Sequence, residues 1–220
     1  MEKYIYRHFG NPSSSHWFGL KAKEAVEKAR KRVAVLLNCQ PDEIIFTSGG
    51  TESNNYVILS VAETFKEKGN HIITSIIEHP AVINPCGHLE KKGFKVTYLP
   101  VDKYGVVDPC DVEKAIKPST ILITIMHANN EVGTIQPIAE ISKIARKRNI
   151  LFHIDAAQSV GKISTKVNEL GVDFLSIAGH KLYAPKGVGA LFMRKGIKIE
   201  PLMYGAGHER GQRPGTENVI

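Results

Sequence analysis

Two side chains with complementary chemistry stand at the ends of two apolar runs of this sequence. Residues 151–155 (LFHID) end on the carboxylate of Asp155, and residues 174–178 (FLSIA) end three positions before Lys181. Both runs have the length and composition of buried strands. Because ligands of open α/β sheets bind at the carboxyl ends of the strands, the sequence predicts an acid and a primary amine at one edge of a sheet.

A lysine and a carboxylate at such an edge suit pyridoxal 5'-phosphate (PLP). The aldehyde of this cofactor needs an amine for a Schiff base, and its ring nitrogen must stay protonated for the ring to act as an electron sink. The alternative interpretation is structural: Asp155 caps a turn and Lys181 is a solvated surface residue, as most lysines are. The pair alone favours the structural interpretation, so the choice between a PLP site and a structural role depends on the other polar segments.

Other polar segments also follow predicted strands. SGGTES leads into a helix, and the free N–H groups of a helix start at Gly50 and Thr51 predict a phosphate cradle. His79 comes just after a strand and is able to stack on a planar ring or move protons. The polar cluster HANNEVG (127–133) follows the most apolar strand and needs partners there. Two further donors, for a phenolate oxygen and for a phosphate, are Gln158 and His180.

The composition is that of an ordinary globular protein. Of 220 residues, 42% are hydrophobic and 23% are charged. No apolar run is as long as a membrane-spanning helix requires, which is about 18 residues. The net charge of +7 is spread along helix faces, so no nucleic-acid partner is expected. No metal site is expected, because histidines and cysteines lack ligand spacing. The three separated cysteines, Cys39, Cys86 and Cys110, favour a reducing, cytoplasmic location.

Apolar runs and amphipathic segments alternate along the chain with short connections. Strands are predicted at 43–47, 71–76, 95–99, 120–126, 151–155, 174–178, 188–194 and 197–203, the seventh of them as a candidate antiparallel strand. Helices are predicted from a cap at Ser14 or Ser15 to Leu37, and at 50–68, 81–92, 109–116 and 138–148. This alternation predicts an α/β fold with a mostly parallel, helix-covered sheet. No linker interrupts it, so residues 1–220 are expected to form one domain.

Seven ordered segments resemble the large domain of the cysteine desulfurase and selenocysteine lyase family, class V of the aminotransferase fold. They are FGNPSSSH, EIIFTSGGTESNN, HIITSIIEH, HANNEVGTIQPI, HIDAAQSVGK, DFLSIAGHKLYAPKGVGAL and GHERGQRPGTEN. The resemblance runs from about residue 9 to residue 219. It implies the large domain of a fold-type-I PLP enzyme, usually a homodimer, that removes sulfur from cysteine or selenium from selenocysteine and leaves alanine.

The resemblance also implies roles for individual residues. Lys181 resembles the Schiff-base lysine, and Asp155 the acid that keeps the pyridine nitrogen protonated. His79 matches the histidine that stacks on the cofactor ring and takes part in proton transfer. Gln158 matches the residue that binds the phenolate oxygen. Thr51, His180 and the backbone of Gly50 match ligands of the phosphate. Asn130 matches an amide near the cofactor and the substrate carboxylate. Thr216 matches a threonine that reaches the phosphate bound in the partner subunit.

The sequence departs from the family pattern at Ala178, where many members have a serine that binds the phosphate. The family also has an earlier N-terminal strand and a small C-terminal domain, which carries the nucleophilic cysteine and the arginine for the substrate carboxylate. Neither part lies within these 220 residues. We therefore expect the chain alone to be poorly active or inactive in persulfide formation.

Two alternatives to a desulfurase or lyase remain open at the level of the sequence. The first is a non-catalytic interaction module, which binds a full-length subunit or a sulfur-acceptor or scaffold protein. The second is another fold-type-I PLP enzyme, such as an aminotransferase. A visible absorbance band that depends on Lys181 separates a PLP enzyme from a module, and a keto-acid product identifies an aminotransferase.

Overall fold

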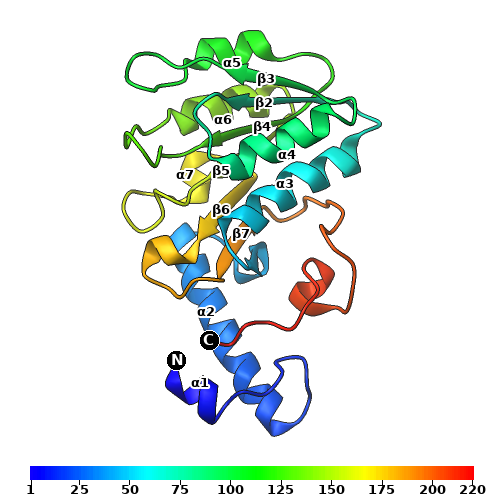
Figure 1. Ribbon diagram of the computed structural model, residues 1–220, viewed down its shortest axis with the longest axis vertical. Helices are drawn as coiled ribbons and strands as arrows, with labels where there is room; N and C mark the ends of the chain where they lie inside the picture. Colours follow the sequence, from blue (N-terminus) through cyan, green and yellow to red (C-terminus); the bar gives the residue numbers. More distant parts are fainter.

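Seven strands form one sheet in the order β1-β7-β6-β5-β4-β2-β3 in the computed structural model, which describes residues 1–220 (Figure 1). Their bounds are β1 Ile44–Thr47, β2 His71–Ser75, β3 Lys95–Leu99, β4 Thr120–Met126, β5 Leu151–Asp155, β6 Phe174–Ala178 and β7 Gly189–Met193. From β3 through β6 all neighbours pair in parallel, whereas β7 runs antiparallel to both β6 and β1. The predicted fold class is confirmed, and so is the antiparallel strand after residue 187.

Helices cover both faces of this sheet. One face is covered by α3 (Gly50–Phe65) and α4 (Pro80–Glu90). The other face is covered by α2 (Trp17–Leu37), α5 (Pro109–Ala115), α6 (Ile138–Lys147) and α7 (Val167–Leu170). Successive strand residues alternate between the two hydrophobic clusters, as Leu175 and Phe174 do, because side chains of a strand point to opposite faces in turn. No helix is long and apolar enough to cross a bilayer.

The short elements complete the chain. The helix α1 (Glu2–Tyr6) lies beside the protruding N-terminal half of α2, near both chain termini (Figure 1). Three 3₁₀ turns are η1 (Pro41–Glu43), η2 (Gly179–Leu182) and η3 (His208–Gly211). The sequence pattern did not reveal α1, α7 or these turns, because each is too short to carry a hydrophobic period.

The strand predicted at 197–203 is wrong. This segment is irregular, and its apolar residues, such as Ile199, pack against the cluster around α3. An eighth strand has no place next to β7, because β7 already pairs with β6 on one side and β1 on the other. The backbone N–H of Glu200 instead donates to the hydroxyl of Thr64, at 2.8 Å.

The predicted cap of the long N-terminal helix is also wrong. The N-cap of α2 is His16, whose Nδ1 accepts a hydrogen bond from the N–H of Gly19 at 3.3 Å. Ser14 belongs to the preceding turn, where its N–H donates to the carbonyl of Asn11. The helix ends at Leu37 as predicted, and Asn38 closes it in the left-handed conformation.

The order of the strands determines where a ligand is able to bind. From β2 the chain moves outward to β3 and then returns to form β4 on the other side of β2. The order therefore reverses between β2 and β4, and such reversals leave a crevice at the carboxyl ends of the strands. The segments that follow β2, β4, β5 and β6 all begin at this edge of the sheet.

Candidate active site

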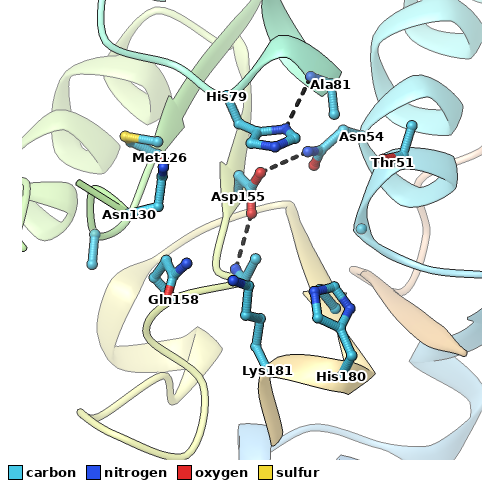
Figure 2. Close-up of a pocket in the computed structure, with 14 residues that line it drawn as sticks. Thr51, Asn54, His79, Ala81, Met126, Asn130, Asp155, Gln158, His180 and Lys181 are labelled. Carbon is cyan, nitrogen blue, oxygen red and sulfur yellow. Dashed lines mark hydrogen bonds between the residues drawn. The ribbon is translucent and has the colours of Figure 1, made fainter. Parts of the chain in front are cut away.

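A cavity of about 210 Å³ lies at this edge, next to the first turn of α3 (Figure 2). Fourteen residues line it: Gly50, Thr51, Asn54, His79, Ala81, Met126, Ala128, Asn130, Asp155, Ala157, Gln158, Ala178, His180 and Lys181. Eight of the nine residues predicted from the sequence are among them, and the exception is Thr216. The structure thus brings together residues from four strand ends and one helix.

Asp155 is the buried charge of the cavity. It ends β5 with a relative exposure of 6%, and its two carboxylate oxygens accept hydrogen bonds from separate donors. Oδ1 accepts from the N–H of Ala157 at 2.9 Å, and Oδ2 accepts from Nδ2 of Asn54 at 2.7 Å. Burial raises the pKa of Asp155, while both hydrogen bonds and the nearby His79 act to lower it. A cationic group in the cavity would favour the carboxylate further.

The start of α3 presents free backbone donors to the cavity. Its N-cap, Gly49, supplies no side chain, so the N–H groups of the first turn have no capping partner. Close contact with the sheet fixes this turn, since a Cβ on Gly189 of β7 would lie 2.6 Å from Gly49 Cα. The hydroxyl of Ser53 bonds Thr47 at 2.8 Å and braces the turn further. Gly50 and Thr51 therefore stand where the sequence predicts an anion site.

His79 and Asn130 approach the cavity from the strand ends at which the order reverses. His79 is the N-cap of α4, and its Nδ1 accepts a hydrogen bond from the N–H of Ala81 at 3.1 Å (Figure 2). Asn130 lies in the loop after β4 and donates from Nδ2 to Glu131 at 2.6 Å. Both side chains are exposed, so they are accessible to a ligand in the cavity.

Lys181 and His180 stand on η2, directly after β6, and Lys181 extends toward Asp155 in Figure 2. Gln158 follows β5, and its Oε1 accepts a hydrogen bond from Lys162 at 3.1 Å. Lys181 is the only lysine among the cavity residues. The amine and the carboxylate predicted from neighbouring strand ends therefore do meet at one cavity.

Thr216 does not line the cavity. It is an exposed residue of the irregular segment after η3. The prediction that it reaches the phosphate in a partner subunit concerns a second copy of the chain, so it stays a prediction.

Asn54 was missed from the sequence, although it donates to Asp155. The residue is 1% exposed, and its Oδ1 has no hydrogen-bond partner within the chain. It lies on the buried face of α3 with Val57 and Val61. The sequence signal is the helical spacing of this amide with apolar residues, which predicts that the amide is buried. A buried amide needs a hydrogen-bond partner, so this spacing could have identified Asn54 as a candidate site residue.

Glu78 is a second buried carboxyl group that was missed, and it lies next to His79. Its Oε1 accepts hydrogen bonds from the hydroxyl of Ser75 at 2.6 Å and from the N–H of Met126 at 2.9 Å, while Oε2 has no partner. Burial raises the pKa of Glu78 to about 8, and the nearby charge of Asp155 adds to this effect. Glu78 is therefore largely protonated at neutral pH.

We expect Glu78 to make the protein less stable as the pH rises. Its folded-state pKa of about 8 is above the ordinary value of 4.5, so its stabilising contribution is complete below pH 4.5 and is lost as the pH passes 8. In E78Q this loss is absent. The free energy of unfolding of the unsubstituted protein should therefore fall relative to E78Q between pH 5 and pH 8, measured by urea denaturation. Parallel profiles would contradict the prediction, and E140Q, on the exposed face of α6, is the control.

Comparison with known proteins places the chain in a family. The sequence matches the family described as Aminotransferase class-V over residues 1–215, and the chain belongs to this family. It is similar to the cysteine desulfurase IscS of Dictyoglomus turgidum, with 58% identity over 219 residues, and to that of Methanosarcina thermophila, with 53% identity over 219 residues. These alignments cover 100% of the chain, but only 56% and 54% of the two relatives. The chain thus spans about half the length of the curated relatives that it matches.

A solved structure has the same fold. A NifS-like protein with 47% identity superposes with a TM-score of 0.96, covering 99% of this chain and 60% of the other. The resemblance to the cysteine desulfurase family and the predicted fold class are confirmed.

Members of this family use PLP, and the cavity residues fit that cofactor. The buried carboxylate of Asp155 suits a protonated ring nitrogen, and the amine of Lys181 suits an aldehyde. The uncapped start of α3 supplies N–H donors for a phosphate. In addition, Oδ1 of Asn54 is a buried acceptor at the cavity that lacks a donor. The donor and acceptor set thus matches a phosphorylated pyridine aldehyde.

Proposed function

We propose that the cavity binds PLP and that the protein acts as a cysteine desulfurase, which removes sulfur from cysteine and leaves alanine. Removal of selenium from selenocysteine is the same reaction on a heavier atom and belongs to the same proposal. One observation carries it: Lys181, Asp155 and His79 meet at one cavity beside the uncapped start of α3. A neighbour with 45% identity, described as SspA in complex with cysteine, supports cysteine as the substrate.

The cavity residues predicted from the sequence divide the binding and chemistry of PLP among them in this proposal. Lys181 would bind the aldehyde carbon, and Asp155 would hold the proton on the ring nitrogen. When bound, PLP supplies an electron sink for the electron pair left on the substrate α-carbon. Gly50, Thr51 and His180 are proposed to bind the phosphate. Gln158 is proposed to bind the phenolate oxygen, and Asn130 the region of the substrate carboxylate.

His79 is proposed to stack on the ring and to move a proton through Nε2. Its Nδ1 is already occupied, because it accepts a hydrogen bond from the N–H of Ala81. The neutral ring therefore carries its proton on Nε2. This fixed tautomer and the position at the N-cap of α4 leave Nε2 as the atom that exchanges a proton with a ligand.

The thiol that accepts the sulfur is not among the cavity residues. Cys39, Cys86 and Cys110 are all free, and none of them lines the cavity. Burial raises the pKa of Cys39 and of Cys86 to about 12, which makes them poor nucleophiles. We therefore propose that a cysteine outside residues 1–220 takes the sulfur, and that the sulfur then passes to an acceptor protein. The reaction would take place in a reducing compartment such as the cytoplasm.

A partner copy also belongs to the proposal. Residues 1–220 would act as one PLP-binding unit in a homodimer, with Thr216 of each copy reaching the phosphate in the other. The exposure of Thr216 and its absence from the cavity of its own chain support this role.

The test is reconstitution of the full-length protein with PLP, followed by incubation with cysteine. We expect a visible absorbance band on PLP binding, and formation of alanine with one equivalent of protein-bound or released sulfur. A keto acid in place of alanine would indicate an aminotransferase. Failure to develop the band would indicate a non-catalytic module and would overturn the proposal.

Ala178 provides a milder test of the phosphate position. Its methyl group ends β6 at the cavity, next to Gly50. Serine at this position would add a hydroxyl donor for the phosphate, and a net hydrogen bond contributes about 0.5–1.5 kcal/mol. We expect A178S to bind PLP about two- to thirteenfold more tightly, measured by absorbance titration. Affinity for pyridoxal, which lacks the phosphate, should not change, and an equal gain for both compounds would contradict the prediction.

A further inference from the structure

The turn η3 and the two residues after it are fixed to the start of α3. Residues 208–213, named here the anchoring segment, contact α3, α2 and β1 through side chains. The contacts join Glu209 with Arg30 and the N–H of Phe46, Gln212 with the hydroxyl of Tyr56, and Arg213 with Glu52. Two of them, at Glu52 and Tyr56, lie one turn apart on α3. The anchoring segment therefore holds the helix whose first turn borders the cavity.

The ion pair between Arg213 and Glu52 is bidentate and shielded from water. Nε of Arg213 lies 2.7 Å from Oε1 of Glu52, and Nη2 lies 3.1 Å from Oε2. The side chains are only 22% and 11% exposed. Oε2 of Glu52 also accepts a hydrogen bond from the N–H of Ser48 at 2.8 Å, in the turn before α3. Burial acts to raise the pKa of Glu52, but the hydrogen bonds from Arg213 and Ser48 outweigh it and hold the pKa below its ordinary value.

The position of Glu52 creates an electrostatic conflict with a phosphate. Glu52 is the third residue of α3, whose first two residues, Gly50 and Thr51, line the cavity. An unpaired carboxylate in that turn would repel a phosphate dianion bound to the same turn. The repulsion would be substantial, because water screens charges weakly at partly buried positions. Arg213 places an opposite charge directly on this carboxylate.

We propose that Arg213 is a positioning residue for the cofactor phosphate, acting through Glu52. It neutralises the charge of Glu52 and, through Glu52, holds the turn at Ser48 against the cavity. The site thereby favours a phosphorylated ligand over its unphosphorylated form. This inference rests on the proposed PLP function and assigns the phosphate selectivity to a residue that does not line the cavity.

The test compares the affinities for PLP and for pyridoxal, titrated by absorbance in phosphate-free buffer. In R213M the carboxylate of Glu52 loses its partner, so we expect PLP to bind about tenfold more weakly, while pyridoxal binding changes less than about twofold. The double variant E52Q/R213M lacks the carboxylate, and we expect it to recover most of the PLP affinity. A loss that is equal for both compounds, or no recovery in the double variant, would overturn the proposal.

E52Q alone tests whether Glu52 and Arg213 affect phosphate binding, even if R213M does not fold. Glutamine keeps an acceptor for Ser48 and Arg213 but removes the negative charge. We expect E52Q to bind PLP at least as tightly as the unsubstituted protein, whereas weaker binding of PLP relative to pyridoxal would overturn the proposal. R210M is the matched control, because Arg210 lies in the same segment but donates to the carbonyls of Asp42 and Ile44. If the unsubstituted protein does not bind PLP, the proposed function itself fails.

Discussion

Replacing Lys181 with alanine is expected to abolish the visible absorbance band of the PLP-loaded protein and to lower alanine formation from cysteine at least about 10⁴-fold. Lys181 is the only lysine that lines the cavity, so no second amine is placed to bind the aldehyde carbon. The same amine is also positioned to exchange protons with a bound substrate. Titration with PLP and a discontinuous assay for alanine measure the two effects separately.

Two lysines serve as controls for this experiment. Lys186 is exposed on the loop after η2 and does not line the cavity, so K186A should retain both the band and the activity. Lys162 contacts the cavity residue Gln158 through its amine. If the band survived in K181A and disappeared in K162A, the assignment of Lys181 would be wrong.

Most cavity residues could be predicted because they follow strands. Strand boundaries depend on local patterns of apolar residues, and in a parallel sheet the carboxyl ends of the strands lie at one edge. That rule brings Asp155, Lys181 and His79 together without any knowledge of the side-chain contacts. It applies equally to Gln158 and Asn130, and all five line the cavity.

Contacts between distant residues could not be predicted in this way. Asn54 and Asp155 are 101 positions apart, and Arg30 and Glu209 are 179 positions apart. A sequence gives the chemistry of each group, but burial and partner depend on how the elements pack. The raised pKa of Glu78 is an example, because it results from burial between β2 and β4.

The wrong strand at 197–203 has a related cause. Its apolar residues do become buried, as the pattern indicates, and Ile199 is 7% exposed. However, a further strand next to β7 would need an unpaired edge of β7, and both edges are already paired, one with β6 and the other with β1. Local patterns therefore predict burial well, but they do not determine which edge of a sheet remains available.

Replacing Asp155 with asparagine is the second change with a large expected effect. Both carboxylate oxygens accept hydrogen bonds, Oδ1 from the N–H of Ala157 and Oδ2 from the amide of Asn54. Asparagine offers only one oxygen, so its own NH₂ group must face one of these two donors. The variant also lacks the negative charge that would hold a proton on the ring nitrogen. We expect alanine formation from cysteine to fall about 10²- to 10⁴-fold.

The loss of charge can be separated from the loss of an acceptor. Asp173 is a partly buried carboxylate outside the cavity whose Oδ2 accepts from the N–H of Phe152 at 2.9 Å, so D173N should lower stability but retain turnover. PLP methylated on its ring nitrogen carries a permanent positive charge. If Asp155 acts by holding a proton there, this analogue should restore part of the activity of D155N and give no gain with the unsubstituted protein. Full activity of D155N with ordinary PLP would show that the carboxylate has no such role.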